Sequence, residues 1–144
     1  MKKILKITLT IFVIFIMAGC GKSYEKLTYT DYMEYFNKKQ GYTIQDNSKY
    51  YDIDIRKYYE AGNGKVQILY IEYAKNEDAV KYIEESYLDK KDYKVKLNDD
   101  YSYVKSTKDK YLKIYRVDNV IISVMALDKE YKKDVNNILK DLGY

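Results

Sequence analysis

Residues 111–127 read Tyr-Leu-Lys-Ile-Tyr-Arg-Val-Asp-Asn-Val-Ile-Ile-Ser-Val-Met-Ala-Leu, the segment with the clearest local signal of secondary structure. Its two runs, 111–117 and 120–127, are rich in β-branched and aromatic residues, which favour strands. Only Asp118-Asn119 separates the runs. Asp and Asn adopt the left-handed backbone conformation at low cost, and two residues suffice to connect antiparallel strands. The stretch therefore predicts a β-hairpin.

A helix is expected directly after this hairpin. Asp128 is a suitable N-cap, and Gly143 is a suitable stop. Apolar side chains between them recur at the spacing i, i+4, i+7, i+8 and i+11, which places them on one helical face. These side chains are Tyr131, Val135, Ile138, Leu139 and Leu142.

A similar order of elements precedes the hairpin. Residues 51–57 alternate between apolar and charged side chains, as in a half-exposed strand, and the turn at residues 61–64 leads to a nearly continuous apolar run at 66–73. Asn76 then caps a second helix, whose inward face consists of Ala79, Val80, Ile83 and Tyr87. This strand–strand–helix order resembles that of the last hairpin and helix, which hints at a duplicated unit.

Two further elements complete the expected fold. Thr28 begins a first helix with an apolar stripe at Tyr29, Tyr32, Met33 and Phe36, and residues 101–105 form another strand. The predicted order is α-ββ-α-βββ-α. It indicates an α+β fold in which helices cover one face of an antiparallel sheet, a two-layer sandwich.

The first twenty residues have a different character. Residues 1–6 carry three lysines and no acidic residue, and residues 7–18 are apolar except for two threonines. This apolar run is shorter than the about 20 residues that span a bilayer, and it fits the core of an export signal. Small residues and a cysteine follow, in the order Met17-Ala18-Gly19-Cys20.

These three regions, in this order, resemble the signal peptide and lipobox of bacterial lipoproteins, although the lipobox more often has leucine where Met17 stands. The resemblance implies cleavage between Gly19 and Cys20 and a diacylglycerol on the Cys20 sulfur. Residues 1–19 are then a signal peptide, 20–27 a lipidated tether and 28–144 a single domain. The implied location is the outer leaflet of the cell membrane, because two acyl chains anchor a protein stably. An uncleaved anchor helix and an ordinary secretory signal remain alternatives.

The C-terminal hairpin, helix and Leu142-Gly143-Tyr144 tail also resemble small lipoproteins of low-GC Gram-positive bacteria. That resemblance is loose and implies no activity.

Charge and composition exclude several classes of function. The chain has 26 Lys+Arg and 22 Asp+Glu, but three of the lysines lie within the export signal, so the expected mature chain has a net charge of only +1 (23 − 22). Charges alternate in sign, and no nucleic-acid partner is expected. The chain has no histidine and one cysteine. Histidine-dependent triads and thiol catalysis are therefore excluded for a lipidated chain, and no cofactor is expected.

Two groups of residues remain candidates for chemistry or binding. Asp52 and Asp54 lie on one face of a predicted strand, where paired carboxylates act in glycoside cleavage or bind a hard cation. A solvated pair neutralised by Arg56 is the simpler interpretation. Aromatic pairs in or beside the same strand can stack on sugars or anchor a protein partner, with one ring of each pair facing outward. They are Tyr50, Tyr51, Tyr58 and Tyr59.

These observations favour a membrane-anchored, extracytoplasmic binding module without catalysis, whose partner is an envelope protein or a cell-wall polymer. The alternative is an envelope hydrolase that uses carboxylates. A substrate-binding lipoprotein of a transporter is a third class, and the length of the chain argues against it because those proteins are usually two-lobed and longer.

Overall fold

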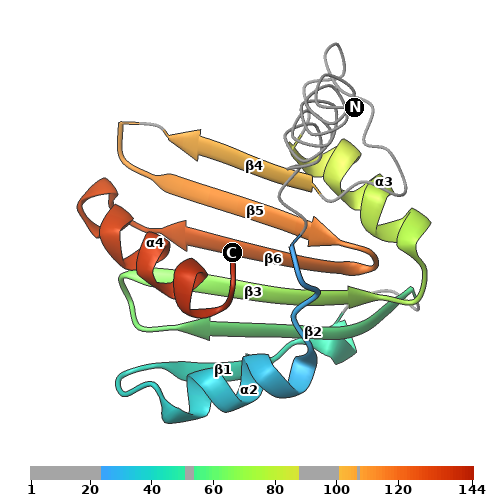
Figure 1. The fold of residues 1–144 in the computed structure, drawn as a ribbon, viewed down its shortest axis with the longest axis horizontal. Coiled ribbons are helices and arrows are strands. Elements are labelled where there is room, and N and C mark those ends of the chain that lie inside the picture. Colours follow the sequence, from blue (N-terminus) through green and yellow to red (C-terminus); the bar gives the residue numbers. More distant parts are fainter. Residues whose placement is uncertain (1–23, 51–53, 88–100, 107) are drawn as a thin grey trace, which may run out of the picture.

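The computed structural model describes residues 24–50, 54–87, 101–106 and 108–144. They form a six-stranded antiparallel sheet with the strand order β1-β2-β3-β6-β5-β4 (Figure 1). The strands are β1 (Thr43–Asp46), β2 (Ile55–Gly62), β3 (Val66–Tyr73), β4 (Tyr101–Ser106), β5 (Tyr111–Val117) and β6 (Val120–Ala126). The helices are α2 (Tyr29–Lys38), α3 (Asn76–Tyr87) and α4 (Lys132–Asp141), with short 3-10 turns η1 (Ser48–Tyr50) and η2 (Lys129–Tyr131).

The predicted hairpin forms β5 and β6. Val117 pairs with Val120 across the two-residue turn, and Asp118 adopts a positive φ of 51°, the conformation expected of a turn residue. Strand β6 also pairs with β3, so the two most apolar strands lie at the centre of the sheet. The α+β class and the antiparallel sheet are confirmed.

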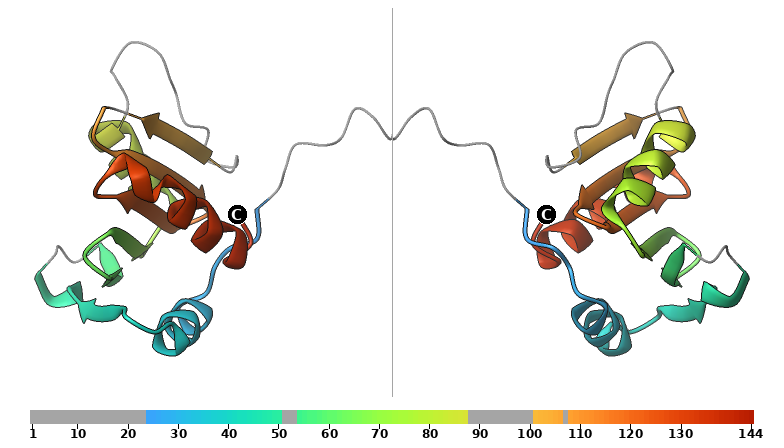
Figure 2. Two further views of the ribbon diagram at one scale, coloured as in Figure 1. Left: turned by 90° about the vertical axis from the view of Figure 1, so that its left-hand side faces the viewer. Right: turned by 90° about the vertical axis from the view of Figure 1, so that its right-hand side faces the viewer.

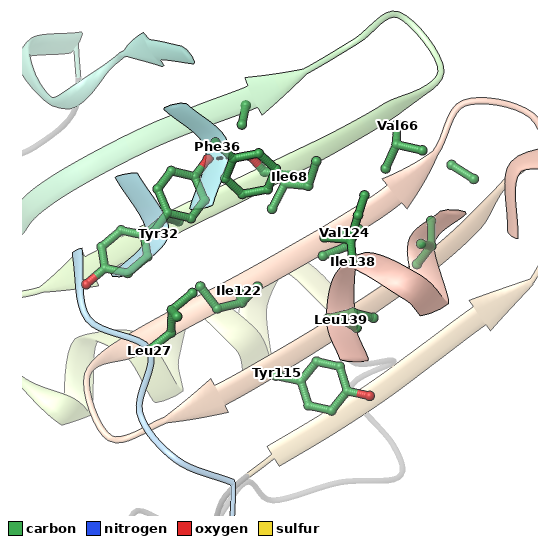
Figure 3. Packing of buried hydrophobic residues seen from close by; sticks show 14 of the residues in the cluster. Leu27, Tyr32, Phe36, Val66, Ile68, Tyr115, Ile122, Val124, Ile138 and Leu139 are labelled. Carbon is green, nitrogen blue, oxygen red and sulfur yellow. Dashed lines mark hydrogen bonds between the residues drawn. The ribbon is translucent and has the colours of Figure 1, made fainter. Parts of the chain in front are cut away.

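The main core lies on one face of this sheet. Alternate residues of β3 and β6, among them Ile68 and Ile122, point toward α2 and α4 (Figure 3). Figure 2 shows these two helices on the same side of the sheet. Their inward residues, including Phe36 and Leu139, are almost completely buried. The burial of this apolar face is expected to be the largest favourable term in the free energy of folding.

Helix α3 departs from the predicted two-layer arrangement, because it packs on the opposite face of the sheet. Its Ala79 and Ile83 form a second cluster with Ile71 and Ile121, whose side chains point away from the main core. The physical reason is that β3 and β6 are apolar on both faces, and a second apolar face also requires a cover. Two helices therefore cover one face and the third covers part of the other.

The element order also differs from the prediction at one place, since the strand β1 precedes β2. Each half of the chain thus contributes a three-stranded meander, β1–β3 or β4–β6, followed by a helix. Strand β2 begins at Ile55, and residues 51–53 of the predicted strand lie outside the described residues. The turn between β2 and β3 consists of Asn63, Gly64 and Lys65, and the Asn63 Oδ1 accepts hydrogen bonds from the backbone N–H groups of Lys65 and Val66.

The segment before α2 packs against the domain. The Leu27 side chain is only 8% exposed and belongs to the main core, and the Tyr24 ring packs on Tyr115 and Tyr144. Residues 24–27, predicted as part of a tether, are therefore held by the fold. Within the described ranges, we find no helix with the length and apolar character required for crossing a bilayer.

Candidate functional site

An open cleft of about 470 Å³ lies beside the segment that leads into α2. Three parts of the chain line it: residues 25–27, the outer side of α2 and the end of α4. Its charged and polar side chains are Glu25, Lys26, Asp31, Glu34, Tyr35, Lys38 and Asp141. The cleft thus gathers four carboxylates around one hollow, and its acidic character distinguishes it from the second described hollow near the β2–β3 turn.

The fold positions these carboxylates through the start of α2 and the end of α4. Thr28 caps α2, because its Oγ1 accepts a hydrogen bond from the Asp31 N–H at 3.1 Å. The Thr28 hydroxyl in turn donates to the Asp31 carboxylate at 2.6 Å. This places Asp31 in the first turn of the helix, where the helix dipole stabilises a negative charge.

The other carboxylates on α2 and α4 also have partners within the protein. Glu34 accepts a hydrogen bond from Lys38 at 2.5 Å, and Asp141 accepts one from the Tyr35 hydroxyl at 2.8 Å. The Lys39 ammonium lies 3.6 Å from the same Asp141 carboxylate and also contacts the Tyr35 hydroxyl. The contacts of Tyr35 and Lys39 with Asp141 join α2 to α4 across the cleft.

The Tyr35 hydroxyl is fixed as a donor in this arrangement. Partial burial raises the pKa of Tyr35 well above its ordinary value, and the hydrogen bond to Asp141 raises it further because the phenolate would meet a second negative charge. Tyr35 therefore stays protonated throughout the physiological pH range. A fixed donor and carboxylates paired with exposed lysines suit reversible recognition of a polar ligand.

The tyrosines singled out from the sequence do not share one surface. Tyr58 and Tyr59 lie on opposite faces of β2, and both are half-buried because each face of the sheet is covered. The Tyr59 hydroxyl donates to Asp46 at 3.0 Å and its ring packs on Tyr29, whereas Tyr58 packs beside the cluster under α3. Tyr50 is 69% exposed, with Lys49 over its ring. Tyr51 lies outside the described residues.

The remaining predicted site residues are only partly described. Asp54 is exposed, and its backbone carbonyl accepts a hydrogen bond from the Ala74 N–H at 2.7 Å. Asp52, Gly19 and Cys20 lie outside the described residues. Within residues 24–50, 54–87, 101–106 and 108–144, no cluster of three or more acidic, histidine or cysteine side chains has a metal-binding arrangement.

Sequence reasoning missed the cleft because its two helices are far apart in the chain. Tyr35 and Asp141 are separated by 106 positions, and no short motif relates them. One signal was present: Asp31, Glu34, Tyr35 and Lys38 recur at helical spacing on the polar side of the first predicted helix.

Comparison of the chain with protein-family models, with curated proteins and with solved structures found no match.

Proposed function

We propose that this protein is a lipoprotein anchored through Cys20 to the outer leaflet of the cell membrane, where its domain acts as a non-catalytic binding module. The observation that carries the proposal is the order of the N-terminal regions: a lysine-rich start, a short apolar run and then Gly19-Cys20. A packed domain begins only four positions later, at Tyr24. An export signal followed immediately by a folded domain is the organisation expected of a lipid-anchored module.

The contacts in the cleft support binding over hydrolysis. A carboxylate hydrolase needs one carboxyl group that donates a proton and a second that stays ionised. Asp31, Glu34 and Asp141 instead each accept a hydrogen bond from within the protein, from Thr28, Lys38 and Tyr35 respectively. All three carboxylates are exposed and meet a donor, so none of them lies in the kind of apolar pocket that sets a catalytic acid apart from its partner. The partner we propose is an envelope protein or a cell-wall polymer.

Metabolic labelling tests the anchor. Cells that produce the wild-type chain or Cys20→Ser are given labelled palmitate and then fractionated. We expect labelled wild-type protein in the membrane fraction and no label on Cys20→Ser, while the matched control Ser23→Ala behaves like wild type. Wild-type protein that takes up no label and stays in the cytosol would overturn the proposal.

Photo-crosslinking tests the binding role. A benzoylphenylalanine at Lys38, which lines the cleft, is compared with one at Lys81, an exposed position on α3. We expect crosslinked products only from position 38: a discrete band for a protein partner, or a muramidase-sensitive smear for a wall polymer. Equal products from both positions, or none from position 38, would contradict a binding role for the cleft.

A further inference from the structure

Lysines gather along one side of α4 and on the strand beneath it. Lys113 lies on β5 between Tyr111 and Tyr115, on the face that α4 covers. Lys132 begins α4 with its ammonium 4.9 Å from the centre of the Tyr111 ring, and Lys140 follows eight residues later. We call this surface the lysine face: Lys113, Lys132, Lys133 and Lys140, together with Val104, which pairs with Lys113 and is 53% exposed.

The carboxylates of α4 lie on the other side of the helix. Asp141 accepts the hydrogen bond from Tyr35 of α2, and Asp134 is close enough to Tyr42 to raise the pKa of its hydroxyl, although burial is the larger cause. Asp134 and Asp141 are seven residues apart and therefore share one helical side. Helix α4 thus separates its charges: the acids lie toward α2 and the cleft, whereas Lys132 lies toward β5 and Lys140 is on the same side of the helix as Lys132.

Tyr24, the described residue nearest to Cys20 in the chain, lies at one end of the lysine face. The Tyr24 ring lies 4.9 Å from the Tyr115 ring and 5.7 Å from the Tyr144 ring, between centroids, beside the end of α4. Four Cα steps separate Cys20 from Tyr24. Even a fully extended chain covers no more than about 14 Å over that distance. An anchored domain is therefore held with the neighbourhood of Tyr24 close to the lipid headgroups.

We infer that the lysine face docks on an anionic phospholipid surface, such as one containing phosphatidylglycerol, and so orients the anchored domain. This inference rests on the proposed lipid anchor at Cys20. Lysines close to an anionic leaflet are attracted to it, and an exposed valine suits the interfacial region. Asp109 and Glu130 lie at the Tyr111 end of the lysine face, away from Tyr24. Glu25 and Asp118 lie nearer Tyr24, and the Asp118 carboxylate is 4.0 Å from the Lys26 ammonium, which offsets its charge.

Fluorescence quenching by lipid tests this orientation on the mature lipidated protein in vesicles. The matched label positions are Ser102→Cys, exposed on β4 opposite Tyr115, and Ser86→Cys, exposed on α3 across the sheet. On phosphatidylcholine vesicles with phosphatidylglycerol, we expect several-fold stronger quenching at position 102 than at position 86. Without phosphatidylglycerol, or in high salt, this difference should shrink.

Substitutions that reverse the charge of selected lysines provide a second test of the docking. Lys132→Glu with Lys140→Glu should remove the difference between positions 102 and 86, whereas Lys75→Glu with Lys81→Glu, beside and on α3, should leave it unchanged. Equal quenching at both positions, or quenching independent of phosphatidylglycerol, overturns the inferred docking. The protein mass is measured first. If the protein carries lipid but positions 102 and 86 are quenched equally, only the docking is refuted. If the protein carries no lipid, both the proposed anchor and the docking are refuted.

Discussion

The backbone N–H of Leu27 donates a hydrogen bond to the phenol oxygen of Tyr144 at 3.3 Å, and this contact joins residues 117 positions apart. The Tyr144 ring also packs on Tyr24 and Tyr115. The last residue of the chain therefore holds the segment that leads toward Cys20. In an anchored protein, this contact is one of the first that joins the membrane-proximal segment to the rest of the domain.

Truncation of Tyr144 should loosen this segment. We expect Tyr144→Ala to lower the free energy of unfolding by about 2 kcal/mol, because a half-buried aromatic ring and a hydrogen-bond acceptor are both lost. Tyr50→Ala is the control and should change the value by less than about 0.5 kcal/mol, since Tyr50 is largely exposed. Urea unfolding measures both; equal effects of the two substitutions would refute the role assigned to Tyr144.

A second prediction concerns Arg116, which is only 1% exposed. Its guanidinium donates to the Asn76 side chain at 2.7 Å and to the Asp118 carbonyl at 2.9 Å, so it connects the start of α3 to the β5–β6 turn. Arg116→Ala should cost about 3 kcal/mol. A double-mutant cycle with Asn76→Ala should give a coupling of about 1–2 kcal/mol. Additive effects would show that the two side chains do not act together.

The turn itself provides a third prediction. Asp118 has a φ of 51°, which glycine adopts freely and β-branched residues avoid. We expect Asp118→Gly to leave stability within about 0.5 kcal/mol of wild type, and Asp118→Val to lower it by about 1–2 kcal/mol. Thermal unfolding followed by circular dichroism distinguishes them. A valine variant as stable as the glycine variant would contradict the turn conformation.

Buried tyrosines predict a loss of stability in alkali. Burial raises the pKa of Tyr32, Tyr70 and Tyr73 above their ordinary value near 10. A raised folded-state pKa gives stability that is complete below pH about 10 and is lost as the pH rises above it, because the unfolded chain releases these protons first. The free energy of unfolding should therefore fall above pH about 10.

One substitution checks the cause of this alkaline loss. Tyr70→Phe removes one ionisable group, so the slope of stability against pH should flatten by up to one proton, about 1.4 kcal/mol per pH unit. Urea unfolding across the alkaline range measures that slope. An unchanged slope would mean that the Tyr70 phenol does not contribute.

Local patterns predicted those elements whose signals are local. The run at 66–73 became β3, Thr28 caps α2, and Asp118-Asn119 forms the turn between β5 and β6. In each case a hydrophobic period or a capping side chain acts within a few residues.

Features that depend on distant pairing were not predictable in this way. Strand β1 has only four residues, mostly exposed, and it is a strand because Ile44 and its neighbours pair with β2. The cleft likewise depends on α2 and α4 meeting through Tyr35 and Asp141. The apolar residues on both faces of β3 did indicate that each face of the sheet needs a cover. A two-layer arrangement covers only one face, so it does not account for α3 on the other.

We propose that Cys20 becomes the lipid-bearing first residue of the mature protein. Mass spectrometry of the N-terminal peptide, from protein extracted with detergent from producing cells, tests it most directly. We expect a peptide that begins at Cys20 and carries a diacylglycerol thioether. A peptide that retains residues 1–19, or one that begins at Cys20 without lipid, would contradict it.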